Sequence, residues 1–100
     1  MGLDMRWIGA GGEVLDEVFD PEFHFAWALA RVPAGSFPLL TAIDIYSDTN
    51  VYPSAAFTRE LEQFRAAQSE PEVALHVSRV VAIARASEMV PGSLLEFLGD

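Results

Sequence analysis

Hydrophobic and polar residues alternate at the beginning of the chain, over residues 3–9. The apolar positions of this segment are Leu3, Met5 and Trp7. A period of two predicts a strand with one buried face. The following segment GAGG (9–12) is rich in glycine, which tolerates the positive φ of a tight hairpin, and residues 13–18 supply a second strand. The chain is therefore expected to open with a β-hairpin.

The next segment, residues 19–32, fits two patterns. Asp20 as the N-cap and Pro21 at the first helical position are typical of a helix start. Apolar residues at helical spacing support this interpretation, but the aromatic and apolar positions of the same segment also alternate as in a strand. We predict a short helix and leave open whether residues 22–32 are helix or strand.

A breaker, PAGSFP (33–38), separates this segment from LLTAIDIY (39–46). The latter is rich in β-branched and aromatic residues and predicts a buried strand. The polar residues that follow it, SDTN (47–50), are typical of a turn.

The period changes to 3.6 residues after Pro53, which predicts helices over residues 54–68 and 70–88. A last apolar segment, 93–100, has the length of a strand. The positions expected to pack these two helices on the sheet are Phe57, Leu61, Phe64, Val73, Val77, Val80 and Val81.

These elements predict a single α+β domain that spans residues 1–100. Its sheet is expected to have about four strands, antiparallel or mixed. A two-helix hairpin and a shorter helix are expected to cover one face of the sheet. Because the apolar residues of segments 3–9 and 93–100 each need a buried face, we expect these two segments to pair in one sheet.

The charge of the chain restricts the possible classes of partner more than any sequence motif does. The chain has fifteen acidic residues against six basic ones, all arginine, and a net charge of −9. Nucleic acids and anionic membranes require a basic surface, so neither is an expected partner. The absence of cysteine, of a signal-peptide pattern and of a long apolar run favours a cytoplasmic protein without disulfides.

Residues 43–50, IDIYSDTN, hold the one local grouping that suggests a site: Asp44, Tyr46 and Asp48. A hard cation takes six or more oxygen ligands, more than this loop supplies, so we expect no metal here. Asp48 is instead expected to bond backbone amides in a turn or at the start of a helix. Asp44 is expected to accept from a neighbouring donor such as an arginine.

No catalytic, cofactor or nucleotide signature is recognisable in the chain. His24 and His76 have no partner at helical spacing that forms a base–nucleophile pair, and each is expected to be structural. Catalysis therefore has no positive support in the sequence, and we expect a non-enzymatic role without a cofactor.

An acidic cluster gives the strongest functional signal. Five carboxylates fall within ten residues with no basic residue between them: Glu13, Asp16, Glu17, Asp20 and Glu22. On an exposed hairpin edge they would attract a basic partner and speed its association. Charges on an edge strand also simply prevent aggregation, and both roles are compatible.

Three short segments, GLDMRW at the start, IDIYSDT in the centre and FLGD at the end, resemble a group of small acidic bacterial proteins. The group has a start like Gly-Leu-Asp-x-x-Trp, a centre like Ile-Asp-x-Tyr-Gly-Asp-Thr and an end like Phe-x-Gly-Asp. The resemblance brings no assigned activity, and it implies a self-standing protein whose last strand belongs to the core. Ser47 stands where the group tends to have glycine.

Three functional hypotheses follow. The first is a non-catalytic domain that masks the basic surface of a partner protein, as antitoxins and immunity proteins do. The second is a small-molecule or cation-binding domain, with enzymes included, centred on Asp44, Tyr46 and Asp48. The third is a homodimeric structural or accessory protein, suggested by the 51% content of hydrophobic residues in a chain of 100.

Overall fold

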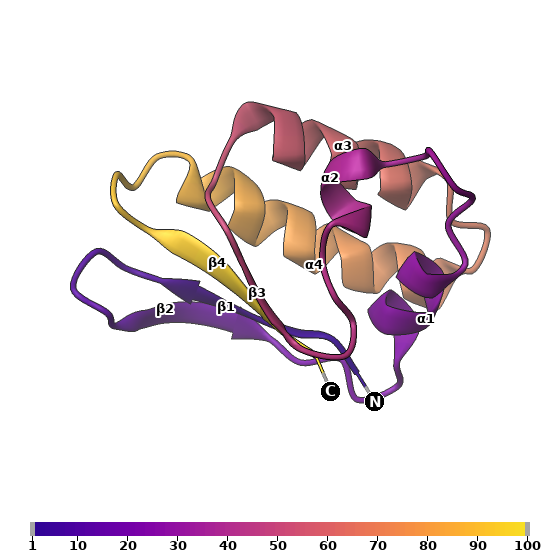
Figure 1. Cartoon of the computed structure of the whole chain (residues 1–100), viewed down its shortest axis with the longest axis horizontal. Coiled ribbons are helices and arrows are strands. Elements are labelled where there is room, and N and C mark those ends of the chain that lie inside the picture. Colours follow the sequence, from indigo (N-terminus) through magenta and orange to yellow (C-terminus); the bar gives the residue numbers. More distant parts are fainter. Residues whose placement is uncertain (1, 100) are drawn as a thin grey trace.

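The computed structural model describes residues 2–99, in which strands and helices form one α+β domain, as predicted (Figure 1). The strands are β1 (Asp4–Ile8), β2 (Val14–Val18), β3 (Asp48–Val51) and β4 (Leu94–Leu98). The helices are α1 (His24–Ala30), α2 (Pro38–Thr41), α3 (Ala55–Ala66) and α4 (Pro71–Ser87).

All four strands belong to one antiparallel sheet in the order β2-β1-β4-β3. The first and last strands therefore lie side by side in its centre, with Met5 opposite Phe97 and Trp7 opposite Leu95. The predicted pairing of the two terminal segments is confirmed. Strands β2 and β3 form the two edges of the sheet.

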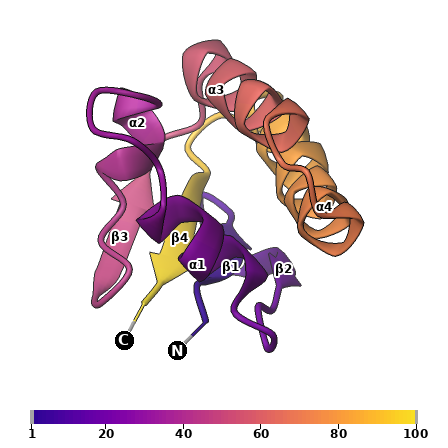
Figure 2. The same ribbon diagram turned by 90° about the vertical axis from the view of Figure 1, so that its right-hand side faces the viewer.

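Helices α3 and α4 lie side by side over one face of the sheet, with α2 above β3 (Figures 1 and 2). The start of α3 is fixed by Ser54, whose hydroxyl accepts a hydrogen bond of 3.1 Å from the amide of Phe57. All seven residues that were expected to pack these helices on the sheet are buried. Among residues 2–99, no helix lies on the opposite face of the sheet.

Residues 24–30 are helical, so the open question about residues 22–32 is answered in favour of a helix. The expected N-cap is wrong, because α1 begins after Phe23, which has φ 60° and provides no side-chain cap. Asp20 still stabilises the start of this helix, because its carboxylate accepts hydrogen bonds from the amides of Phe25 (3.2 Å) and Ala26 (3.0 Å).

The predicted strand over residues 39–46 is wrong. Its first residues belong to α2, its last residues form a turn, and the strand β3 comes later, where a turn was predicted. Leu40 and Ile43 are both buried. In a strand, residues three apart point to opposite faces, whereas in a helical turn they share one face. Burial of both residues therefore favours the helical turn over the local β propensity.

Candidate functional site

The exposed acidic residues Asp16 and Glu17 lie on the hairpin strand β2 and Glu13 lies directly before it; these three residues are called here the acidic edge. The carboxylate of Asp16 accepts a hydrogen bond of 2.8 Å from the amide of Glu17. The side chain of Glu13 folds back over Gly9 in the hairpin turn, where a β-carbon would collide with it.

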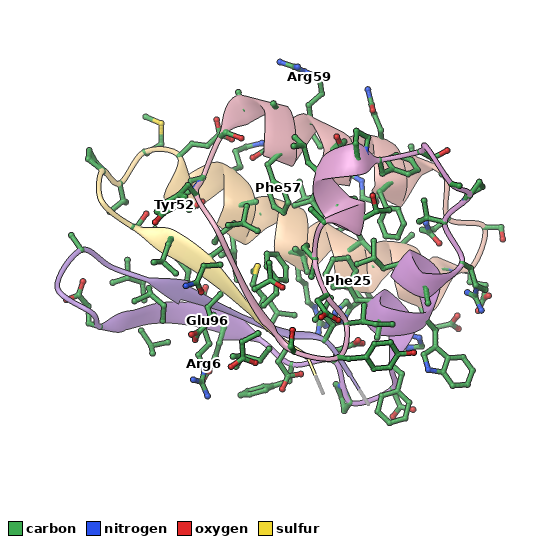
Figure 3. All side chains as sticks on the ribbon, in the orientation of Figure 1. Arg6, Phe25, Tyr52, Phe57, Arg59 and Glu96 are labelled. Atoms are coloured by element: carbon green, nitrogen blue, oxygen red, sulfur yellow. The ribbon has the colours of Figure 1, made fainter. Side chains whose placement is uncertain are left out.

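The helix-free face of the sheet continues this negative surface. Arg6 lies between Glu17 on β2 and Glu96 on β4, with nitrogen–oxygen distances of 3.5 and 3.8 Å. Figure 3 shows the side chains of Arg6 and Glu96 pointing away from the helices. The other arginines of the chain lie on or directly after helices: Arg31, Arg59, Arg65, Arg79 and Arg85. The helical layer therefore holds five of the six arginines, but it also carries the acids Glu60, Glu62, Glu70, Glu72 and Glu88, whereas the sheet has Arg6 alone.

Asp20, expected in this acidic cluster, does not lie on the surface. It is 1% exposed. Besides the two amides of α1, its carboxylate accepts from the amide of Leu3 at 3.0 Å, and its own amide donates to Asp4 at 2.7 Å. Asp20 thus ties the start of β1 to the start of α1, which is a structural role. Glu22, the other acid of this cluster beyond the strand, is exposed.

His76 of α4 lies beside this buried carboxylate. Its Nε2 atom is 3.8 Å from an oxygen of Asp20, and within residues 2–99 this nitrogen has no hydrogen-bond partner. Burial lowers the pKa of His76 below its ordinary value. The negative charge of Asp20 opposes the change, and His24 and Arg79 add to it. His76 is a buried neutral ring, in keeping with the expected structural role.

In the central loop, residues 43–50, the turn bonds expected of Asp48 are made by Asp44. Asp44 accepts at 2.9 Å from the amide of Tyr46 and at 2.9 Å from the hydroxyl of Ser47. The expectation that Asp44 accepts from a neighbouring donor is confirmed, with an amide and a hydroxyl in place of an arginine. The two hydrogen bonds lower the pKa of Asp44. Asp48 lies on the edge strand β3 and is exposed, so its expected place in a turn or at the start of a helix is wrong.

Gly99 closes this turn from the other end of the chain. Its amide donates to the carbonyl oxygen of Ser47 at 3.0 Å. A β-carbon on Gly99 would lie 2.6 Å from backbone atoms of Ile45 and Ser47, which is too close for any other residue. The loop that carries Asp44, Tyr46 and Asp48 is thus held by the end of the last strand.

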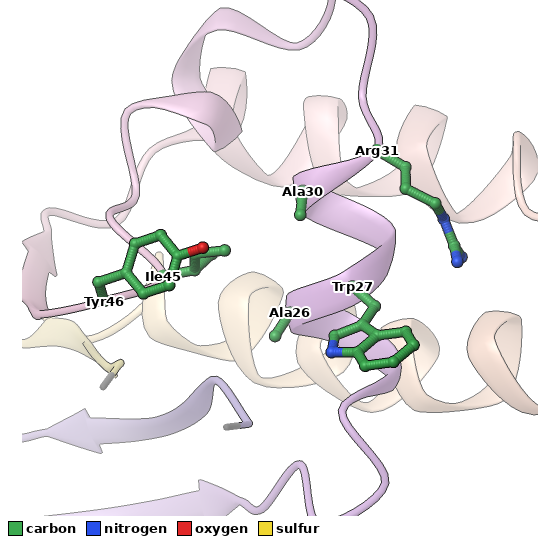
Figure 4. Close-up of a pocket in the computed structure, with 6 residues that line it drawn as sticks. All are labelled: Ala26, Trp27, Ala30, Arg31, Ile45 and Tyr46. Carbon is green, nitrogen blue, oxygen red and sulfur yellow. The ribbon is translucent and has the colours of Figure 1, made fainter.

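Tyr46, the third residue of this grouping, borders a cleft of about 290 Å³ against α1 (Figure 4). Tyr46 faces the surface formed by Ala26 and Ala30, and Trp27 stands at the edge, 61% exposed. The sequence analysis missed this cleft, although two alanines one helical turn apart beside an exposed tryptophan were a usable signal. Within residues 2–99, no group of three or more histidine or acidic side chains is placed to hold a metal ion.

Comparison with known proteins adds no relative: no protein-family model, curated protein or solved structure matches the chain. No helix among residues 2–99 is long and apolar enough to cross a membrane.

Proposed function

We propose that the protein is a non-catalytic domain that binds a basic surface of another protein through the acidic edge, in the manner of an antitoxin or immunity protein. The observation that carries the proposal is the clustering of exposed carboxylates at one edge of the sheet, on a strand that has no basic residue. Asp16 and Glu17 are exposed on β2 and Glu13 is exposed directly before it, and Arg6 on the neighbouring β1 is shared between Glu17 and Glu96.

Such a surface suits a basic partner for two physical reasons. A concentrated field of one sign steers an oppositely charged protein and raises its association rate, to about 10⁸–10⁹ M⁻¹s⁻¹ in the best cases at low salt. The attraction is also screened at a Debye length of about 8 Å in physiological salt, so binding would weaken as salt is added. Val14 and Leu15, 52% and 43% exposed between the acids, would supply apolar contact.

The competing hypothesis of a cation site has less support. Both oxygens of Asp44 already accept hydrogen bonds, and the side chain of Asp48 lies on a different element, β3. The homodimer hypothesis remains a separate proposal, which sizing of the purified protein by light scattering addresses directly.

The test compares two triple variants that remove the same three charges. In E13Q/D16N/E17Q the charges come from the acidic edge, and in E70Q/E72Q/E88Q they come from exposed positions on and beside α4. Proteins captured by the immobilised parent at low salt would be identified, purified and titrated by calorimetry in a salt series. We expect a basic partner whose affinity falls on the order of tenfold or more in the edge variant and much less in the helix variant.

Equal losses in both variants would show that only net charge matters and would contradict the proposal. So would a partner that binds independently of salt.

A further inference from the structure

Strand β3 forms the second edge of the sheet, and its surroundings differ from those of β2. It pairs with β4 on one side, and within residues 2–99 no strand pairs with its other side. Thr49 and Val51 point to the helical side of the sheet, because they are paired with the buried residues Phe97 and Leu95. Asp48 and Asn50 point to the helix-free face. Within residues 2–99, the other side of β3 is therefore a hydrogen-bonding edge without a paired strand.

A mostly apolar cavity of about 350 Å³ lies along this edge, between β3 and α2. Its residues come from α2 and the turn after it, from β3, and from the start of α3: Leu39, Ala42, Ile43, Thr49, Asn50, Val51, Tyr52, Ser54 and Phe57. We call this cavity the β3 groove. Phe57 is only 2% exposed and Leu39 is 42% exposed, so the groove has a buried base and an open wall. Figure 3 labels Phe57 near the start of α3 and Tyr52 just beyond the end of β3.

Both walls of the β3 groove are held in place by hydrogen bonds. Helix α2 is fixed to α3 by Glu60, whose carboxylate accepts from the amides of Leu39 (2.9 Å) and Leu40 (3.0 Å). The turn that leads into β3 is fixed by Thr49, whose hydroxyl accepts from the amide of Asp44 at 3.1 Å. A groove with such walls is formed before any ligand arrives, which lowers the entropic cost of binding.

We propose that the β3 groove binds an extended peptide segment of another protein as an additional strand. A free strand edge offers backbone donors and acceptors that an extended backbone satisfies, and a neighbouring pocket selects its side chains. Because side chains alternate along a strand, every second residue of the segment would face the β3 groove and the others would face the helix-free side.

The charges beside β3 define the chemistry of that segment. On the helix-free side, Asp48 and Asn50 lie on β3, and Glu96 lies opposite Asn50 on β4. Basic side chains at the outward positions would meet these carboxylates. Apolar side chains at the inward positions would meet Leu39, Ile43 and Phe57. The segment therefore alternates apolar and basic residues, and the volume of the groove limits it to one or two inward side chains.

The probe is a blocked heptapeptide in which lysine alternates with valine and leucine, and its control is the same peptide with proline at the central position. Proline removes a backbone donor and cannot continue the pairing. Binding is followed by amide chemical shifts in ¹⁵N-labelled protein at physiological salt. We expect shifts at Thr49, Asn50 and Val51 with the first peptide, and affinity at least about tenfold weaker for the proline peptide.

Ala42→Trp would fill the groove, and Ala86→Trp on the exposed side of α4 is its matched control. We expect the first to weaken peptide binding at least about tenfold and the second to leave it unchanged. If Ala42→Trp fails to fold, Leu39→Lys tests the same wall, because it places a positive charge where apolar side chains would lie. Thermal melts establish that each variant is folded.

Three results would overturn the proposal. Equal binding of the proline peptide would mean attraction by charge alone. Shifts confined to Val14–Glu17 would assign the peptide to the acidic edge. Dilution-dependent shifts at β3 without peptide would mean that a second copy of this chain occupies the groove. The inference does not depend on the proposed function, because E13Q/D16N/E17Q is expected to keep the peptide shifts at β3.

Discussion

The two edges of the sheet, β2 and β3, meet the solvent in different ways. Strand β2 exposes Val14 and Leu15, but the acidic edge surrounds them. The carboxylate of Asp16 accepts a hydrogen bond from the amide of Glu17. Its pairing with β1 is also irregular, with a register shift between Trp7 and Ile8. Strand β3 has four residues and runs beside an apolar hollow.

An unpaired edge invites association with other strands, and proteins protect such edges by charge, by bulges, by short length or by a cover. Strand β2 is protected by charge and by the irregular register. Strand β3 is protected by its short length and by the neighbouring α2 and the turn after α2, neither of which pairs with it. Protection by charge produces a surface that repels acidic proteins, whereas an incomplete cover leaves a groove. The two edges of one sheet therefore differ in chemistry, because one is charged and the other borders an apolar groove.

The largest expected effect concerns the base of the β3 groove. Phe57 is 2% exposed, and its ring centre lies 6.0 Å from that of Phe97 in the central strand β4. Phe57→Ala should lower the free energy of unfolding by about 3–5 kcal/mol, because the lost contacts leave a cavity. Urea denaturation of the purified variant measures this loss.

The matched change on the other edge is Leu15→Ala, at a position that is 43% exposed. Its effect should stay within about 0.5 kcal/mol, as for other surface substitutions. If the two substitutions cost the same, the β3 groove has no buried base and the contrast between the edges is wrong.

The next effect is a change of stability with pH that should involve the region near the end of β2 and not the β3 groove. His76 lies near the end of β2, beside Asp20, with His24, Arg79 and Asp4 as further charged neighbours. Because burial lowers the pKa of His76, the unfolded chain binds a proton more readily than the folded chain. Stability should therefore fall as the pH drops below about 6.5, the ordinary histidine value, until the folded protein is also protonated.

Denaturation of the parent and of His76→Leu at pH 7.5 and 5.5 measures this contribution. The leucine variant should lose less stability over the interval than the parent does, and His24→Gln provides the comparison for a general histidine effect. Amide shifts in the same range should concentrate around α1 and α4, with the β3 groove unchanged. If His76→Leu has the same pH dependence of stability as the parent, His76 does not cause the loss of stability at low pH.

The sequence predicted the elements whose pattern is local and regular. The alternation over residues 3–9 and the 3.6-residue period after Pro53 gave the paired central strands and the two long helices with the correct buried faces. Residues 39–46 were misassigned, because their β-branched composition favoured a strand. The contacts that stabilise a helix there include hydrogen bonds that Glu60, on the distant helix α3, accepts from the amides of α2.

The candidate sites were less predictable for the same reason. Asp20 was expected in an exposed cluster because its neighbours in sequence are acidic. Its actual partners include the amide of Leu3, seventeen residues away, and His76 on α4. The β3 groove was not visible in the sequence at all, since its walls come from three elements that include a misassigned one.

The smallest effect distinguishes the two acids of the loop before β3. Asp44→Ala removes the acceptor of two hydrogen bonds in the turn, whereas Asp48→Ala removes an exposed side chain from an edge strand. We expect a small but measurable fall in melting temperature for Asp44→Ala and almost none for Asp48→Ala. Since the pKa of Asp44 is lowered, its contribution is present at neutral pH and should disappear as the pH falls below about 3.8. In the peptide titration the order should reverse, because Asp48 lies on β3 and points to the face where the basic side chains of the peptide would lie, whereas Asp44 stabilises only the turn. A larger loss of stability for Asp48→Ala, or weaker peptide binding for Asp44→Ala alone, would show that the turn and the edge are not separate features.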